Sequence, residues 1–114
     1  VVINLVTNAR DATPPGGRVA VALDTVTLGP VERAALDLRA GDYVRLSVTD
    51  TGSGIEPALM SRIFEPFFTT KQKDRGTGLG LSTVHGVANG CGGGVYVTSR
   101  VGEGTTFDVY FPTA

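Results

Sequence analysis

The segment "VVINLVTNARDA", residues 1–12, has the periodicity of a helix with two unlike faces. Its apolar side chains fall on one side at about 100° per residue: Val2, Ile3, Leu5, Val6 and Ala9. Asn4, Asn8 and Asp11 form a narrow stripe on the other side. Asn is a poor helix former compared with Lys or Glu, and its side-chain oxygen is a hard ligand that suits Mg²⁺. The stripe therefore favours either a metal or phosphate site or an ordinary solvated face.

The next segments alternate between turn signals and β-propensity. "TPPGG", residues 13–17, ends the helix, and residues 18–28 predict a strand with one buried face. Residues 29–42 are a polar connection with room for a short helical turn. Residues 43–50, "YVRLSVTD", predict a second strand.

The second half of the chain predicts helices and a closing hairpin. Residues 56–64 predict a short helix with a proline in its first turn, and residues 65–78 a mobile loop. Residues 79–90 predict a helix closed by "GCGGG", and residues 95–99 and 105–111 predict two strands joined as a hairpin. This order predicts an α+β fold: a two-layer α/β sandwich with a mixed, mainly antiparallel sheet covered on one face by helices.

Composition limits the class of protein. With 114 residues, a formal charge of −1 and 41% hydrophobic residues, we expect one folded domain over residues 1–114 that attracts neither nucleic acid nor membrane surfaces. A single cysteine and a single histidine exclude an internal disulfide and a Cys/His metal cluster. No apolar run reaches about 18 residues. Because the chain starts without methionine inside a helix, we expect an N-terminally truncated fragment, whose parent could be membrane-anchored.

The segment "DTGSG", residues 50–54, places a carboxylate at the end of an apolar strand. An ionised carboxylate accepts hydrogen bonds and cannot donate them, so Asp50 suits the exocyclic amine of adenine and would repel the carbonyl of guanine. Gly52 and Gly54 would let the backbone approach a flat ligand closely. A simple Asp/Gly turn is the alternative.

The segment "GTGLG", residues 76–80, precedes a predicted helix but matches neither the dinucleotide fingerprint nor the P-loop. Free backbone N–H groups at a helix N-terminus bind anions, and Lys71, Lys73 and Arg75 add positive charge upstream. The stretch is therefore either a phosphate cradle or a flexible glycine loop.

Together these segments resemble the ATP-binding domain of sensor histidine kinases. "NLVTNARDA" is similar to the N box, "DTGSGI" to the first G box, "IFEPFFTTK" to the F box and "GTGLGLS" to the second G box, in the family's order. The resemblance covers nearly the whole chain, including "GEGTTFDVYFP", and is strongest to nitrogen-regulation-type and hybrid sensors. It implies the Bergerat fold shared with DNA gyrase and the MutL ATPases.

The resemblance also implies roles for individual residues. Asn8 would coordinate Mg²⁺ that bridges the ATP phosphates, Asn4 would help to hold the phosphates or the metal, and Asp50 would accept from the adenine amine. The lid over the phosphates would include Lys71, which joins Asn4 and Asn8 as a candidate catalytic residue. The full implied nucleotide site is Asn4, Asn8, Asp11, Asp50, Gly52, Gly54, Lys71, Gly76, Thr77, Gly78, Leu79, Gly80, Leu81 and Thr105.

The residue type at Asn4 bears on whether the domain would hydrolyse ATP or transfer its γ-phosphoryl group. Relatives that hydrolyse ATP carry a glutamate four residues before the Mg²⁺-binding asparagine, and here that position is Asn4. An amide cannot act as a general base. The departure disfavours hydrolysis and favours transfer of the γ-phosphoryl group to another acceptor.

Three other positions have simpler interpretations. His85 lies inside the helix after the second G box, so we interpret it as a packing residue and not as the phosphoacceptor. Phe64, Phe67 and Phe68 are expected to anchor the base of the lid. Cys91 matches no functional residue of the family and is expected to be buried or half-buried.

The sequence therefore predicts the catalytic domain of a two-component histidine kinase, a protein-histidine kinase that uses ATP and Mg²⁺. Its partners would be a histidine-bearing dimerisation domain, absent here, and a response-regulator receiver. We expect a cytoplasmic domain without direct membrane contact, and little turnover by this fragment alone. The alternatives are a nucleotide-binding regulatory module without phosphotransfer and an anti-sigma-type serine kinase, although the latter usually has the glutamate that is missing at Asn4.

Overall fold

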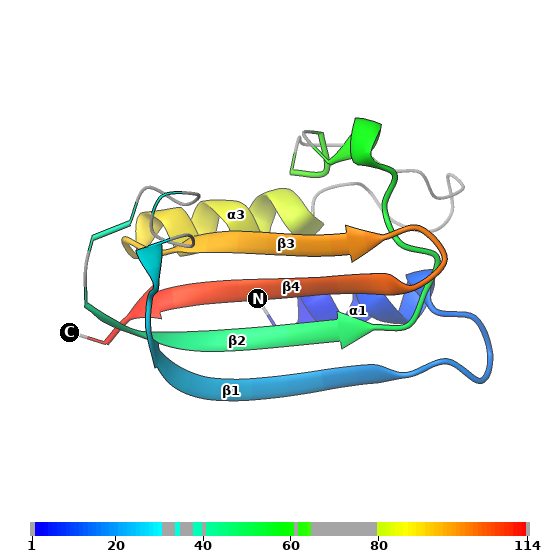
Figure 1. The fold of residues 1–114 in the computed structure, drawn as a ribbon, viewed down its shortest axis with the longest axis horizontal. Coiled ribbons are helices and arrows are strands. Elements are labelled where there is room, and N and C mark those ends of the chain that lie inside the picture. Colours follow the sequence, from blue (N-terminus) through cyan, green and yellow to red (C-terminus); the bar gives the residue numbers. More distant parts are fainter. Residues whose placement is uncertain are drawn as a thin grey trace.

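The computed structural model describes residues 2–30, 34, 38–39, 41–60, 62–64 and 80–113 (Figure 1). Its elements are α1 (Val2–Ala12), β1 (Val19–Thr27), β2 (Asp42–Asp50), η1 (Pro57–Leu59), α3 (Gly80–Gly90), β3 (Gly94–Arg100) and β4 (Gly104–Pro112). The whole predicted loop over residues 65–78 lies outside the described residues, and with it Phe67, Phe68, Lys71, Gly76, Thr77 and Gly78, as does Leu79.

The sheet confirms the predicted α+β class. Its strands lie in the order β1-β2-β4-β3, and each described pair is antiparallel. Both long helices lie on one face of the sheet, with α3 against β3 and β4 and α1 against β2 (Figure 1). The structure is therefore a two-layer sandwich with α1 and α3 together on one face of the sheet.

The main core fills the space between helices and sheet. Alternate residues of the two central strands point toward the helices, which is why Leu46, Val48, Phe107 and Val109 are buried there. The helices contribute Leu5, Ala9, Val84 and Ala88 to the same cluster. A smaller cluster contains Tyr43 and Tyr110, whose rings meet edge to face with centroids 6.5 Å apart. Tyr43 and Tyr110 lie on the opposite face of the sheet from the main core, so β2 and β4 are packed on both faces.

Strand β1 was predicted correctly, but its predicted buried face was wrong. Val21 pairs directly with Val48, so both side chains lie on the helix-covered side of the sheet. Val48 is 1% exposed, whereas Val21 is 51% exposed and Leu23 is 70% exposed. Because β1 is an edge strand that α1 contacts only in part, Val21 and Leu23 are left largely uncovered by the described residues (Figure 1).

Two helical predictions also need correction. Val2 and Ile3, at the start of α1, are 47% and 81% exposed, so only Leu5 and Ala9 are fully buried on the apolar side of that helix. The helix predicted over residues 56–64 is one 3₁₀ turn, Pro57–Leu59, followed by turns. Its hydrogen bonds, such as Leu59 N–H to the Glu56 carbonyl at 2.9 Å, span three residues and not four.

The predicted ends of the elements agree with the structure. Helix α1 ends at Ala12 before "TPPGG", and α3 ends at Gly90 before a turn in which Gly92 has φ +84°. Strands β3 and β4 form the predicted hairpin.

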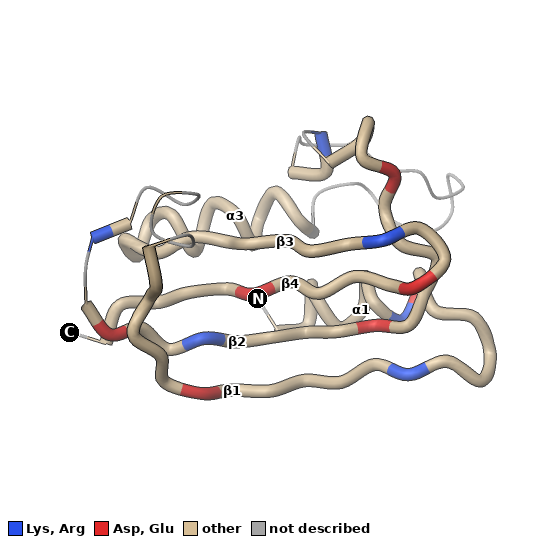
Figure 2. Tube along the Cα trace, viewed as in Figure 1, with Lys and Arg blue, Asp and Glu red and all other residues tan. Residues whose placement is uncertain are grey.

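Acidic and basic positions are interspersed along the described chain (Figure 2). Among the described residues no helix is long and apolar enough to cross a membrane.

Candidate functional site

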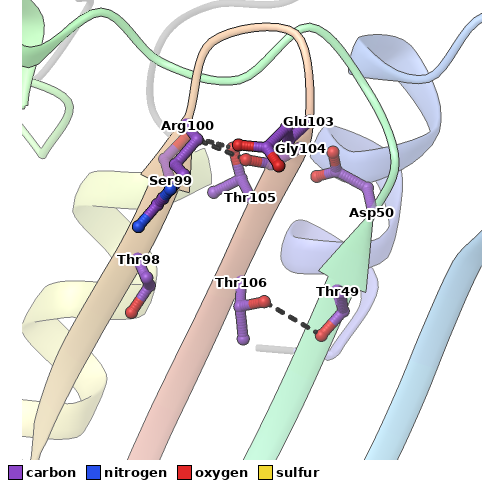
Figure 3. A pocket seen from close by; sticks show the side chains of 9 residues that line it. All are labelled: Thr49, Asp50, Thr98, Ser99, Arg100, Glu103, Gly104, Thr105 and Thr106. Carbon is purple, nitrogen blue, oxygen red and sulfur yellow. Dashed lines mark hydrogen bonds between the residues drawn. The ribbon is translucent and has the colours of Figure 1, made fainter.

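Asp50 ends β2 with a carboxylate that is almost completely shielded from solvent, at 3% exposure. Its Oδ1 accepts a hydrogen bond from the backbone N–H of Gly52 at 2.8 Å, which closes a tight local turn. In the sheet Asp50 pairs directly with Thr105 of β4, itself 5% exposed (Figure 3). Two buried polar side chains thus stand together where an apolar residue would be expected.

Gly52 and Gly54 are both pressed against the chain's own backbone. A Cβ on Gly52 would lie 2.3 Å from the Ala12 carbonyl oxygen at the end of α1. A Cβ on Gly54 would lie 2.2 Å from the Arg100 carbonyl oxygen at the end of β3, and Gly54 also has φ +78°. The segment after Asp50 is therefore wedged between the end of α1 and the β3–β4 hairpin, which requires glycine whatever the segment does toward a ligand.

An open depression of about 220 Å³ lies beside this segment (Figure 3). Its lining comes from the ends of β2, β3 and β4: Thr49, Asp50, Thr98, Ser99, Arg100, Glu103, Gly104, Thr105 and Thr106. A second depression joins the end of α1 to the segment after β2, and it brings Asp11 and Gly52 together. The structure therefore gathers Asp11, Asp50, Gly52, Gly54 and Thr105 at one end of the sheet.

The asparagine stripe is placed by α1 itself. Asn4, Asn8 and Asp11 are all half-buried, unlike a freely solvated face. Asn8 and Asn4 lie about one and two helical turns before Asp11. Arg10 approaches Asp11 to 3.8 Å in a long ion pair. The stripe thus starts at the second depression and runs away from it along the helix.

The glycine-rich segment leads into a helix, as predicted. Helix α3 begins at Gly80, and Leu81 is partly buried against the main core. The side chain of Leu81 therefore serves packing, and any role toward phosphates belongs to its backbone. Lys71, Gly76, Thr77, Gly78 and Leu79 lie outside the described residues, so their implied roles stay predictions.

His85 contacts two neighbours on the exposed side of α3. Its ring stacks on Phe64 with centroids 4.9 Å apart and 27° between the planes, and the amide nitrogen of Asn89 lies within 3.3 Å of both ring nitrogens. Phe64 in turn meets Phe107 of the core edge to face. These contacts agree with a packing role for His85 and an anchoring role for Phe64.

The prediction for Cys91 was wrong. Its side chain is exposed, because it lies in the turn after α3 whose backbone folds back onto the helix. The N–H of Gly93 donates to the Ala88 carbonyl at 2.9 Å, so the turn is held by backbone bonds and the thiol points outward.

Arg45 and Asp24 form a bidentate ion pair between β2 and β1, at 2.7 and 3.1 Å. The hydrogen bonds to Asp24 raise the pKa of Arg45 above its ordinary value. A guanidinium is charged at every working pH, so this shift changes no protonation state. The pair joins the edge strand to the sheet and lies away from Asp50.

Ser99 is a site residue that the sequence analysis missed. It faces Thr105 across the β3–β4 hairpin and lines the same depression as Asp50. The signal in the sequence was its distance from Thr105, since residues that flank a short hairpin turn pair directly.

The family model described as "Histidine kinase-, DNA gyrase B-, and HSP90-like ATPase" matches residues 1–114. The sensor kinase CckA of Brucella abortus is 48% identical over 98% of this chain, and the two-component sensor PprA of Pseudomonas aeruginosa is 46% identical over 100% of it. This chain spans 12% of the length of each of those two relatives.

Solved structures show the same likeness. The catalytic domain of histidine kinase ThkA superposes with a TM-score of 0.71 at 34% identity, covering 97% of this chain and 62% of that one. Full-length ShkA in complex with AMPPNP superposes with a TM-score of 0.72 at 32% identity, covering 97% of this chain and 20% of that one.

Proposed function

Because the chain belongs to the family of histidine kinase-, DNA gyrase B- and HSP90-like ATPases, and is homologous to catalytic domains of sensor histidine kinases, we propose how it acts. We propose that it binds Mg²⁺·ATP and supplies the γ-phosphoryl group to a histidine of a separate dimerisation domain. A response-regulator receiver then takes the phosphoryl group. The N-box and F-box sequences support a nitrogen-regulation-type or hybrid sensor as the parent, with this ATP-using domain in the cytoplasm.

The observation that carries the proposal is the burial of Asp50 beside Thr105. A carboxylate that is 3% exposed needs hydrogen-bond donors, and the structure supplies the N–H of Gly52. The adenine amine is a further donor of the required kind, and guanine presents a carbonyl at the same place. Asp50 therefore fits an adenine nucleotide.

The side chains along α1 fit the other end of the nucleotide. Asn4 and Asn8 offer neutral amide oxygens, and Asp11 offers a carboxylate, on one half-buried side of the helix. Oxygen ligands of this kind suit Mg²⁺, which neutralises charge on the phosphates when it is bound. We assign Asn8 as the metal ligand and Asn4 as its neighbour toward the phosphates.

Asn4 also supports transfer over hydrolysis. Hydrolysis requires a base that removes a proton from water, and an amide side chain has no such capacity. With Asn4 at that position, α1 can orient the phosphates without activating water. Lys71 and the backbone of Gly76 to Leu81 are proposed to cover the phosphates.

Incubation with ATP labelled at the γ-phosphate tests the proposal. The chain is mixed with the histidine-bearing dimerisation domain of a sensor kinase, and with the same domain carrying alanine at that histidine. We expect label only on the histidine-bearing domain, and the label should be lost in acid because the P–N bond is acid-labile. Acid-stable label would indicate a serine kinase, and label on neither protein would contradict phosphotransfer.

A further inference from the structure

The hydroxyl of Ser99 joins three parts of the chain at the end of the sheet. Its Oγ accepts a hydrogen bond from the backbone N–H of Ile55 at 2.7 Å, and it lies 3.1 Å from the carbonyl oxygen of Gly104, to which its one hydrogen can be donated. It also lies 2.8 Å from the Oγ1 of Thr105. One small side chain thus fastens the segment after Asp50 to the β3–β4 hairpin.

Ser99, Thr105 and Asp50 form a row across the sheet, here called the base row. Thr105 lies on β4 between its two partners, paired with Ser99 of β3 on one side and with Asp50 of β2 on the other. Directly paired residues point to the same face, so all three side chains share the side of the sheet that the helices cover. Thr105 is therefore the buried hydroxyl next to Asp50, and Ser99 is its hydrogen-bond partner (Figure 3).

The hydroxyls of Ser99 and Thr105 have one hydrogen each to donate. A serine hydroxyl has one hydrogen and two lone pairs, and the N–H of Ile55 occupies one lone pair of Ser99. If the hydrogen of Ser99 goes to the Gly104 carbonyl, its second lone pair receives the hydrogen of Thr105. If it goes to Thr105 instead, Thr105 keeps its own hydrogen for another acceptor. The Ser99 hydroxyl therefore fixes the direction of the Thr105 hydrogen, which points away from Ser99 when Ser99 donates to Thr105.

To distinguish adenine from guanine, a protein needs both a hydrogen-bond acceptor and a hydrogen-bond donor at the base. Adenine offers a donor amine next to an acceptor ring nitrogen, whereas guanine offers an acceptor carbonyl next to a donor ring N–H. Asp50 can only accept. A donor for the ring nitrogen must come from a neighbour of Asp50, and Thr105 is placed for it.

We propose that Ser99 is a positioning residue for the nucleotide site: it orients the Thr105 hydroxyl beside Asp50 and holds the Ile55 backbone, and it thereby contributes to the preference for adenine over guanine. The inference rests on the proposed function, because it assumes that Asp50 and Thr105 face the base. Ser99 acts through Thr105 and does not itself touch the nucleotide.

The test is a pair of calorimetric titrations, with Mg²⁺·ATP and with Mg²⁺·GTP, on the chain and its variants. For Ser99→Ala we expect the Kd for ATP to rise about fivefold or more, and the Kd for GTP to change less than about twofold. The preference for ATP is the Kd for GTP divided by the Kd for ATP, and it should therefore fall in Ser99→Ala. Ser99→Thr keeps the hydroxyl on a half-buried strand position and should restore the original preference. Equal weakening of both nucleotides by Ser99→Ala would overturn the proposal.

Thr27→Ala is the matched control. It also removes a strand hydroxyl from a side-chain hydrogen bond, because Thr27 Oγ1 donates to Asp42 Oδ1 at 2.6 Å, and this pair lies at the other end of β2 from Asp50. We expect the preference for ATP in Thr27→Ala to equal that of the unchanged chain. A preference that falls as far as in Ser99→Ala would overturn the proposal.

A double substitution tests the route through Thr105. In a Thr105→Val background, where no hydroxyl remains to be oriented, Ser99→Ala should change the ratio by less than about twofold. If Ser99→Ala does not fold, Ser99→Cys replaces it with a weak hydrogen-bonding group of similar size and should give an intermediate ratio.

Asp50→Asn separates the two possible failures. If Asp50→Asn lowers the preference for ATP, measured as the Kd for GTP divided by the Kd for ATP, and Ser99→Ala leaves it unchanged, the inference about Ser99 is overturned while the adenine assignment stands. If neither variant changes the ratio, the adenine assignment itself fails, and the role of Ser99 fails with it.

Discussion

At the scale of single residues, Asp50 is the strongest support for adenine binding, because a carboxylate that is 3% exposed is unusual at the end of an otherwise apolar strand. Its Oδ1 accepts a hydrogen bond from the Gly52 N–H, which would explain the burial by a local turn. The proposed hydrogen bond from an adenine amine would explain it by ligand binding. Only the second explanation predicts that replacing Asp50 weakens ATP binding in a folded variant.

Replacing Asp50 by alanine should weaken ATP binding about five- to 150-fold, which corresponds to a lost hydrogen bond of about 1–3 kcal/mol to a charged group. Calorimetric titration measures the change, and circular dichroism verifies that the variant is folded. A loss smaller than twofold in a folded variant would contradict contact with the base.

Asn8→Ala should weaken ATP binding mainly in the presence of Mg²⁺. An amide oxygen that coordinates the metal contributes only when the metal is bound. Titrations in Mg²⁺ and in a chelator measure the difference, and Thr7→Ala, at an exposed position on the same helix, is the control. Equal losses in both buffers would indicate that Asn8 contacts the nucleotide or the fold without the metal.

At the scale of elements, β1 and β2 provide a matched pair of valines. Val21 and Val48 are direct neighbours on the same face, but they are 51% and 1% exposed. Val48→Ala should lower the free energy of unfolding by about 2 kcal/mol, whereas Val21→Ala should lower it by less than about 1 kcal/mol. Urea denaturation measures both. Similar losses would show that β1 is covered in solution.

Helix α3 contains a glycine that packing does not require. Gly86 lies in the middle of the helix, and apart from the backbone of its own helix no atom of the described residues lies within 4 Å of the place a Cβ would occupy. Gly86→Ala should therefore stabilise the chain by about 0.5–1 kcal/mol through helix propensity and a less flexible unfolded state. Thermal unfolding should show a higher midpoint, and a lower one would indicate that this face of α3 is already in contact.

The elements also show what a sequence can predict. The ends of α1 and α3 and the β3–β4 hairpin follow from proline and glycine at positions where the chain must turn, so they were predicted correctly. Burial could not be predicted equally well. Alternation in residues 18–28 is the same for an edge strand and a central one, and only the folded strand order places Val21 and Leu23 at the edge of the sheet, where both are exposed.

Some residues of the candidate site could likewise be predicted from the sequence, and others could not. Asp50 and the glycines after it could be predicted, because their spacing is local and their residue types are unusual for a strand end. Ser99 could not, since its importance comes from hydrogen bonds to Ile55 and Thr105 across the fold. The exposed thiol of Cys91 was also missed, because the direction of a side chain in a turn depends on the backbone path.

At the scale of the whole molecule, the layers place the proposed groups at one end of the sandwich. Asp50, Thr105 and the hairpin lie at the ends of β2 and β4, and α1 brings Asp11 to the segment that follows β2. The asparagine stripe continues from there along the helix layer. A nucleotide that lies along α1 would therefore have its base at the sheet end and its phosphates toward Asn8 and Asn4.

Calorimetric titration of the chain with ATP and with GTP, each with and without Mg²⁺, tests whether the site binds an adenine nucleotide together with the metal ion. We expect ATP to bind more tightly in Mg²⁺ than without it, and GTP to bind at least about tenfold more weakly than ATP, a difference of about 1.4 kcal/mol. Equal binding of the two nucleotides, or no binding by a folded sample, would contradict the proposal that this chain binds Mg²⁺·ATP with Asp50 at the base.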